Sequence, residues 1–230
     1  MRDEMKDMKI NRWAGAFGLA ACGLTIIEFP LWMLGGMPPS FSDITAFSDY
    51  VTKANIFYLH RTLLDLFILM FLMLFMAGFR QVILQKGHDQ EWLATLFFGI
   101  GVVYIALTLV SDSITGAVGL DTIGGNPSPI AIRALTESTI LMYGSVGLFL
   151  IGAMLLLAGY LTLTTCGLPR WTGWVAIVAA MLNFAFVPSM YFGNNPQGFY
   201  TSSGWGPSVG ATFPFLIWIL VTSIVMIRNR

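Results

Sequence analysis

Four carboxylates stand within otherwise apolar stretches of this chain, and they are the groups best able to do chemistry. They are Glu28, Asp65, Asp112 and Glu137. A charged side chain in hydrocarbon costs about 3 kcal/mol or more, so such groups usually face the interior of a helix bundle, pair with one another or line water. Carboxylates held together in this way can carry a proton or serve as an acid and a base.

Basic and polar side chains lie at similar depths. Arg61 precedes Asp65 by four residues and Arg133 precedes Glu137 by four, which places each pair on one helix face. Each is either an ion pair at a helix end or a recognition site for an anionic head group or solute. A lone histidine such as His60 is more often an interfacial hydrogen-bonding residue than a ligand. The candidate polar pocket therefore comprises Glu28, His60, Arg61, Asp65, Asp112, Arg133, Glu137 and Asn183.

The sequence lacks the residues that several other kinds of functional site require. The chain has two histidines and a formal net charge of +0, which argues against a three-histidine metal site and against nucleic acid as a partner. No nucleotide-binding loop and no Ser-His-Asp arrangement is present. Gly144 and Gly147 lie inside an apolar stretch, where glycines favour helix packing over phosphate binding. We expect no cofactor and no metal, with a hard-metal site on three of the carboxylates as a minor alternative.

The elements that position these residues are membrane helices. The chain is 56% apolar and 10% charged, whereas soluble domains carry about 25% charged residues. Apolar runs of about 18 residues or more recur, each able to cross about 30 Å of hydrocarbon. We predict an all-α, polytopic membrane protein of six transmembrane helices in one domain, residues 1–230. The expected spans are residues 13–36, 56–84, 92–120, 131–163, 171–192 and 211–227, with a loop and a short amphipathic helix before the second.

Charge distribution sets the predicted orientation. Six spans put both termini on one side. With the N-terminus inside, the outer side of the membrane holds only Lys53, Arg61 and Arg133 of the twelve Lys and Arg residues. This pattern follows the positive-inside rule, so both termini are predicted to be cytoplasmic in a multi-pass protein of the cell inner (plasma) membrane. The pocket residues then occupy the outer half or the midplane, and the lipid bilayer is the expected partner.

The first and fifth spans resemble each other. At a constant offset of 158 residues, 9 of 30 aligned positions are identical between residues 12–41 and residues 170–199. We interpret this as a pseudo-repeat of helix 1 and helix 5, in which each copy loses regular helix bonding near its proline, Pro30 or Pro188. Small or polar residues follow one face of each copy, ending near Glu28 in one and passing through Asn183 in the other. These stripes predict that the two spans pack at the centre of the bundle.

The chain also resembles a known group of proteins. Three features carry the likeness: the Arg-Trp-x-Gly start at Arg12, the His60-Arg61 pair with Leu63 and Asp65, and the run from Leu168 to Trp174. They are similar to an uncharacterised family of bacterial multi-pass integral membrane proteins, a domain-of-unknown-function family. The resemblance covers nearly the whole chain and implies six helices in a bacterial or archaeal cell membrane. It implies no catalytic residue.

Three functional hypotheses remain open at this point. The first is a non-enzymatic integral membrane protein whose outer-facing polar pocket binds or passes a small solute, ion or lipid. The second is a membrane-embedded enzyme that uses paired carboxylates on a lipid-like substrate. The third is a structural or accessory subunit of a membrane complex, as a homo-oligomer or with a membrane partner. We favour the first, and the sequence names no substrate.

Overall fold

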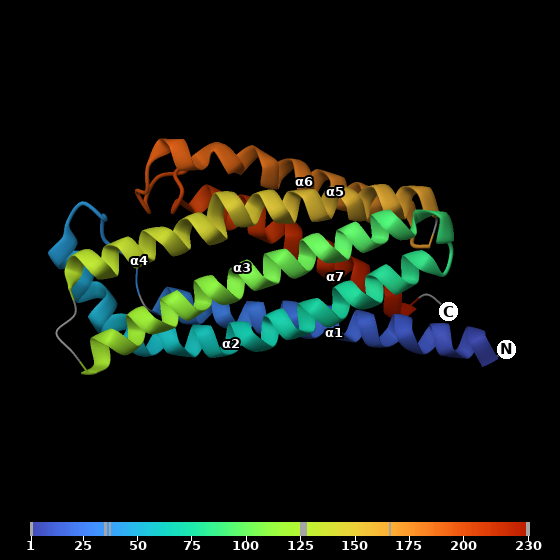
Figure 1. Cartoon of the computed structure of the whole chain (residues 1–230), viewed down its shortest axis with the longest axis horizontal. Coiled ribbons are helices and arrows are strands. Elements are labelled where there is room, and N and C mark those ends of the chain that lie inside the picture. The colour runs from blue at the N-terminus through green and yellow to red at the C-terminus, as the bar shows by residue number, and fades with distance from the viewer. Residues whose placement is uncertain (1, 35, 37, 125–127, 166, 229–230) are drawn as a thin grey trace.

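The structure, a computed structural model, describes residues 2–34, 36, 38–124, 128–165 and 167–228 and is built from helices (Figure 1). Within these residues, six helical segments are long and apolar enough to cross a membrane. The elements in chain order are α1 (Arg2–Leu34), α2 (Ile44–Leu84), η1 (His88–Gln90), α3 (Glu91–Gly124), α4 (Pro129–Leu141), η2 (Met142–Val146), α5 (Gly147–Thr165), α6 (Arg170–Phe186), η3 (Val187–Phe192), η4 (Gly206–Ala211) and α7 (Thr212–Arg228).

The predicted all-α polytopic fold is therefore confirmed, and both chain ends lie at the same end of the bundle (Figure 1). The segment before the second span was expected to be a loop with a separate short helix, and the structure differs there. Helix α2 begins at Ile44 and runs unbroken to Leu84. Asp43 caps its start, because the Asp43 carboxylate accepts a hydrogen bond from Ala46 N at 3.0 Å. No proline then interrupts the helix.

The helices form a closed ring in chain order. Helix α1 packs on α2, α2 on α3, α3 on α5, α5 on α6 and α6 on α7, which returns to pack on α1. The expectation that the first and fifth spans, α1 and α6, share the centre is wrong. Helix α7 lies between them, and α1 and α6 run along opposite edges of the bundle (Figure 1).

The small-residue faces of α1 and α6 nevertheless point inward as predicted. In α1, Ala14, Gly18 and Ala21 are buried. In α6, Ala179 and Asn183 are buried in the same way. Each stripe faces its ring neighbours, so the sequence pattern identified the buried surface of each helix but not the helix that covers it.

The interior of the ring is apolar and aromatic. Trp218 of α7 is fully buried, and its ring lies 5.5–6.3 Å, centroid to centroid, from three phenylalanine rings, Phe79, Phe75 and Phe215. These contacts join α7 to α2 across the inside of the bundle. Burial of such large aromatic side chains stabilises the packing of α7 against α2.

Helices α2, α3 and α4 extend past the other helices at the end opposite the termini (Figure 1). The 41 residues of α2 span about 61 Å as a helix, twice the hydrocarbon thickness of about 30 Å. A second apolar cluster holds these extensions together and joins Phe41 and Phe47 to Val51, Val118 and Ile132. The polar residues of α2 and α3 discussed below lie just beneath this small cap.

A close crossing of α1 and α2 gives a first testable prediction. A Cβ atom added at Gly78 would overlap the methyl group of Ala14, whereas one added at Gly99 would meet no other atom within 4 Å. Gly78→Ala should therefore force α1 away from α2 and cost about 1–3 kcal/mol. Gly99→Ala should be neutral or stabilising by up to about 1 kcal/mol. Thermal unfolding midpoints of the two purified variants in detergent test this, and equal midpoints would contradict the crossing.

Candidate functional site

Asp112, on α3, is the centre of the candidate site. Its side chain is 2% exposed, and the Tyr143 hydroxyl of η2 donates a hydrogen bond to Asp112 Oδ1. The second oxygen, Oδ2, is buried and receives no hydrogen bond from any N–H or hydroxyl group of the described residues. Burying a carboxylate oxygen without a donor is costly, so Asp112 requires a further partner.

Asp65, on α2, is an acidic neighbour of Asp112. Its carboxyl group lies close enough to act on that of Asp112, one helical turn from the contact of Thr62 with Asp112. Ionised carboxylates are acceptors only, so two carboxyl groups can form a hydrogen bond only when one of them carries a proton. A proton on either carboxyl group would therefore allow the two aspartates to bond to each other between neighbouring helices.

Arg61 and Glu28 form an ion pair beside the aspartates. Arg61 Nε donates to Glu28 Oε1 at 3.0 Å and thereby links α2 to α1. The i,i+4 spacing suggested Asp65 as the partner of Arg61 instead. Asp65 lies close enough to Arg61 to attract it electrostatically, but the hydrogen bond goes to Glu28, which faces Arg61 from the adjacent helix.

The charges of this cluster do not balance. Glu28, Asp65 and Asp112 act electrostatically on one another, and Arg61 is the cation that acts on them. Fully ionised, the four side chains would carry three negative charges against one positive. An excess of buried negative charge is unfavourable in a medium of low dielectric constant, which again favours a bound proton or cation.

Hydroxyl groups surround the aspartates. Thr62 Oγ1 lies 3.4 Å from the backbone oxygen of Asp112, to which it donates. The Ser111 hydroxyl lies near that of Tyr143, and the partly buried Tyr104 lies close enough to Asp65 and Asp112 to feel their charge. The site is thus rich in oxygen atoms.

A break in a helix brings Tyr143 to the site. The segment η2 is a π-helix between α4 and α5, and Gly144 within it has a non-helical backbone with ψ −116°. Single π-turns inside α-helices are rare and occur frequently at functional sites. Tyr143 was not among the sequence candidates, because a tyrosine in an apolar run looks like any core aromatic. The adjoining Gly144 was the available signal.

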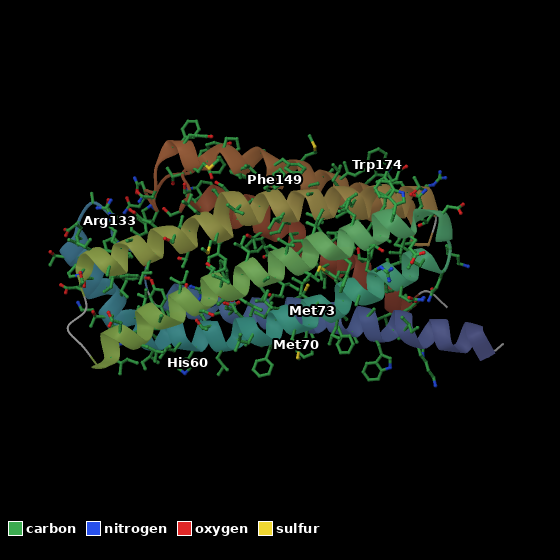
Figure 2. All side chains as sticks on the ribbon, in the orientation of Figure 1. His60, Met70, Met73, Arg133, Phe149 and Trp174 are labelled. Atoms are coloured by element: carbon green, nitrogen blue, oxygen red, sulfur yellow. The ribbon has the colours of Figure 1, made fainter. Side chains whose placement is uncertain are left out.

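Arg133 and Glu137 belong to a separate polar group. Arg133 Nε donates to Glu137 Oε1 at 2.9 Å, as the i,i+4 spacing predicted, and Asn194 Nδ2 donates to the same oxygen at 2.7 Å. Both charged side chains are about one-third exposed, at 36% and 35%. This group ties the loop after η3 to α4, and Arg133 lies at the end of the bundle opposite the termini (Figure 2).

Two further candidates also lie outside the cluster. His60 is exposed and points away from the bundle on α2 (Figure 2). Asn183 is fully buried in α6, where its Nδ2 donates to the backbone oxygens of Ala179 at 2.8 Å and Ala211 at 3.2 Å. Ala211 ends the π-helix η4, so Asn183 satisfies a carbonyl at another helix break.

A groove on the surface is chemically different from this cluster. It lies between α6 and α7, has a volume of about 400 Å³ and is lined by apolar groups including Trp174, Val178 and Pro214. Trp174 points outward from α6 (Figure 2). None of the polar candidates lines it, and its lining suits lipid chains.

The fold and the cluster together define a polytopic α-helical membrane protein with ionisable side chains buried between its helices. Comparison with known proteins adds no closer identity: no protein-family model, no curated protein and no solved structure matches the chain.

Proposed function

We propose that this protein is a non-enzymatic membrane protein that binds an exchangeable proton at Asp65 and Asp112 and couples it to the passage of an ion or small solute. The observation that carries the proposal is the buried Oδ2 atom of Asp112, which has no hydrogen-bond donor within the part of the chain that the structure describes and lies in the neighbourhood of the Asp65 carboxyl group. A purely structural network would be expected to pair each acid with a base or a donor. Here one buried oxygen of Asp112 has no such donor among the described residues.

The depth of the cluster supports access from the outer side. Asp112 follows Trp92 by 20 residues, about 30 Å along a helix. With Trp92 at the inner interface, Asp112 lies near the outer boundary of the hydrocarbon. The distribution of Lys and Arg supports this orientation and a cell inner (plasma) membrane. The likeness to the bacterial multi-pass family is compatible with it and remains a proposal.

Infrared spectroscopy of the purified protein in nanodiscs tests the bound proton. A protonated carboxyl group gives a C=O stretch separate from that of carboxylates. We expect this band in the wild-type protein, with a shift in D₂O that shows exchange with solvent. Asp65→Asn and Asp112→Asn should each remove the band, because either change leaves one carboxyl group whose partner can donate to it. Glu137→Gln, which alters an acid outside the cluster, should leave the band in place.

Proton movement across the membrane tests the coupling. In proteoliposomes that contain a pH-sensitive dye, the wild-type protein should move protons under an imposed membrane potential or solute gradient, and Asp112→Asn should not. Absence of the protonated band in the wild-type protein would refute the proposal. A band that does not shift in D₂O, with no flux, would favour the structural-subunit hypothesis.

A further inference from the structure

We propose that Asp65 and Asp112 also form a binding site for a monovalent hard cation, Na⁺, which replaces the proton that they share. The inference rests on the proposed function, because it assigns a competitor to the same carboxyl pair. It adds a ligand class that a proton site alone does not require.

The ligand atoms are those of hard cations. Asp65 and Asp112 provide carboxylate oxygens, and the hydroxyl of Tyr143 is bonded to Asp112 Oδ1. The Ser111 hydroxyl adjoins Tyr143, and Thr62 Oγ1 lies beside the Asp112 backbone. Hard cations take oxygen ligands from carboxylates, hydroxyls and carbonyls.

An independent observation indicates that a ligand is needed. Asp112 is 98% buried, because its exposed fraction is 2%, yet its Oδ2 accepts no hydrogen bond from N–H or hydroxyl donors of the described residues. Once the shared proton leaves, this oxygen has no donor to replace it. A cation that bridges the two carboxylates would satisfy it.

The surrounding charges favour a single positive charge. Glu28 faces the pair from α1 and is neutralised by Arg61 of α2, while Tyr104 of α3 and Tyr143 of η2 are the other titratable groups beside it. Exchange of one proton for one Na⁺ leaves the total charge of this group unchanged. A transition metal is disfavoured, because such metals prefer nitrogen or sulfur ligands and this site offers oxygen atoms.

The helix break supports the same conclusion. Tyr143 lies in a π-helical segment whose next residue, Gly144, leaves the helical conformation. Interrupted transmembrane helices coordinate Na⁺ or H⁺ in secondary transporters, since their unwound segments present oxygen atoms inside the membrane. Segment η2 places such a break against the carboxyl pair.

The reaction balances as the protonated site plus Na⁺ giving the Na⁺-bound site plus one H⁺. It is tested by adding NaCl to the purified protein in weakly buffered detergent solution and following proton release with an indicator dye. We expect saturable release of up to one proton per protein, with parallel loss of the protonated C=O band. Choline chloride at equal concentration should release none.

Variants separate ligand loss from unfolding. Tyr143→Phe keeps both carboxyl groups and should keep the protonated band, but it removes one oxygen and should weaken the apparent Na⁺ affinity about tenfold. Tyr160→Phe, a matched change at a half-exposed tyrosine of α5, should leave the affinity unchanged. Asp112→Asn should abolish both the band and the release.

The outcomes distinguish the two proposals. A protonated band with no release on addition of NaCl would overturn the Na⁺ site and leave the proton site intact. Equal release by choline chloride would show an ionic-strength effect and also overturn the Na⁺ site. Release by Mg²⁺ or Ca²⁺ but not by Na⁺ would overturn the monovalent assignment. Absence of the band from the wild-type protein in Na⁺-free solution would refute the proton site itself.

Discussion

Arg61→Gln is expected to lower the free energy of unfolding by about 2–4 kcal/mol, because it leaves the Glu28 carboxylate buried without its partner. The Arg61 and Glu28 side chains are 26% and 15% exposed, so water can replace little of the lost hydrogen bond. The change also removes the cation that acts on Asp65 and Asp112. The unfolding free energy can be measured in mixed micelles of mild and denaturing detergent.

Two comparisons make this expectation specific. Arg133→Gln breaks an ion pair whose members are 36% and 35% exposed, and it should cost at most about 1 kcal/mol. The double variant Glu28→Gln with Arg61→Gln should recover most of the loss, because a buried ion pair replaced by neutral groups is often tolerated. Equal losses for Arg61→Gln and Arg133→Gln would show that the Glu28 pair is not desolvated as the structure indicates.

The outline of the fold could be predicted because membrane helices follow simple physical rules. Every backbone polar group must be satisfied within the hydrocarbon, so long apolar stretches such as residues 92–120 can only be helical. The ends of the helices were harder to predict. Residues 44–55 carry Asp49 and Lys53 and look like part of a loop with a short separate helix, yet they continue α2 because Phe47 and Val51 belong to the second apolar cluster. Tertiary packing there overrides local polarity.

The site could be predicted only in part. Depth along each helix identified Glu28, Arg61, Asp65 and Asp112, since buried ionisable residues are rare and tend to cluster. Helical spacing then suggested the partner of Arg61 on its own helix, whereas the structure gives it Glu28 on α1. Contacts within one helix are visible in a sequence, but the order of helices around a ring is not.

The sequence analysis also assigned residues to the cluster that lie outside it, because the order of the helices is not visible in a sequence. Glu137 was grouped with the cluster but joins Asn194, because α4 leads from the break at Gly144 toward the end of the bundle opposite the termini (Figure 1). Tyr143 is the reverse case, because it lies at the site but was not among the residues selected from the sequence. A π-turn depends on how a helix is packed rather than on its composition, so the turn that brings Tyr143 to Asp112 has no firm signature in the sequence.

Trp218→Ala is expected to lower the free energy of unfolding by about 3–5 kcal/mol, the range for removal of a large aromatic side chain from a well-packed core. Trp218 is 0% exposed, and its indole ring contacts Phe75 and Phe79 of α2 inside the bundle. Helix α7 closes the ring of helices by packing on α1. A cavity at Trp218 would therefore weaken the packing of α7 against the first helices of the chain. Unfolding in mixed micelles would measure the loss.

The indole of Trp218 allows the packing contribution to be separated from the polar one. Its Nε1 has no hydrogen-bond acceptor among the described residues, so Trp218→Phe removes an unsatisfied donor while it keeps most of the ring. This variant should lose less than about 1.5 kcal/mol. Trp92→Ala, at a tryptophan that is 66% exposed, should also have a small effect. Equal destabilisation by Trp218→Phe and Trp218→Ala would contradict this expectation. It would mean that the indole N–H bonds a group inside the bundle, so that the apolar core joining α7 to α2 contains a polar contact.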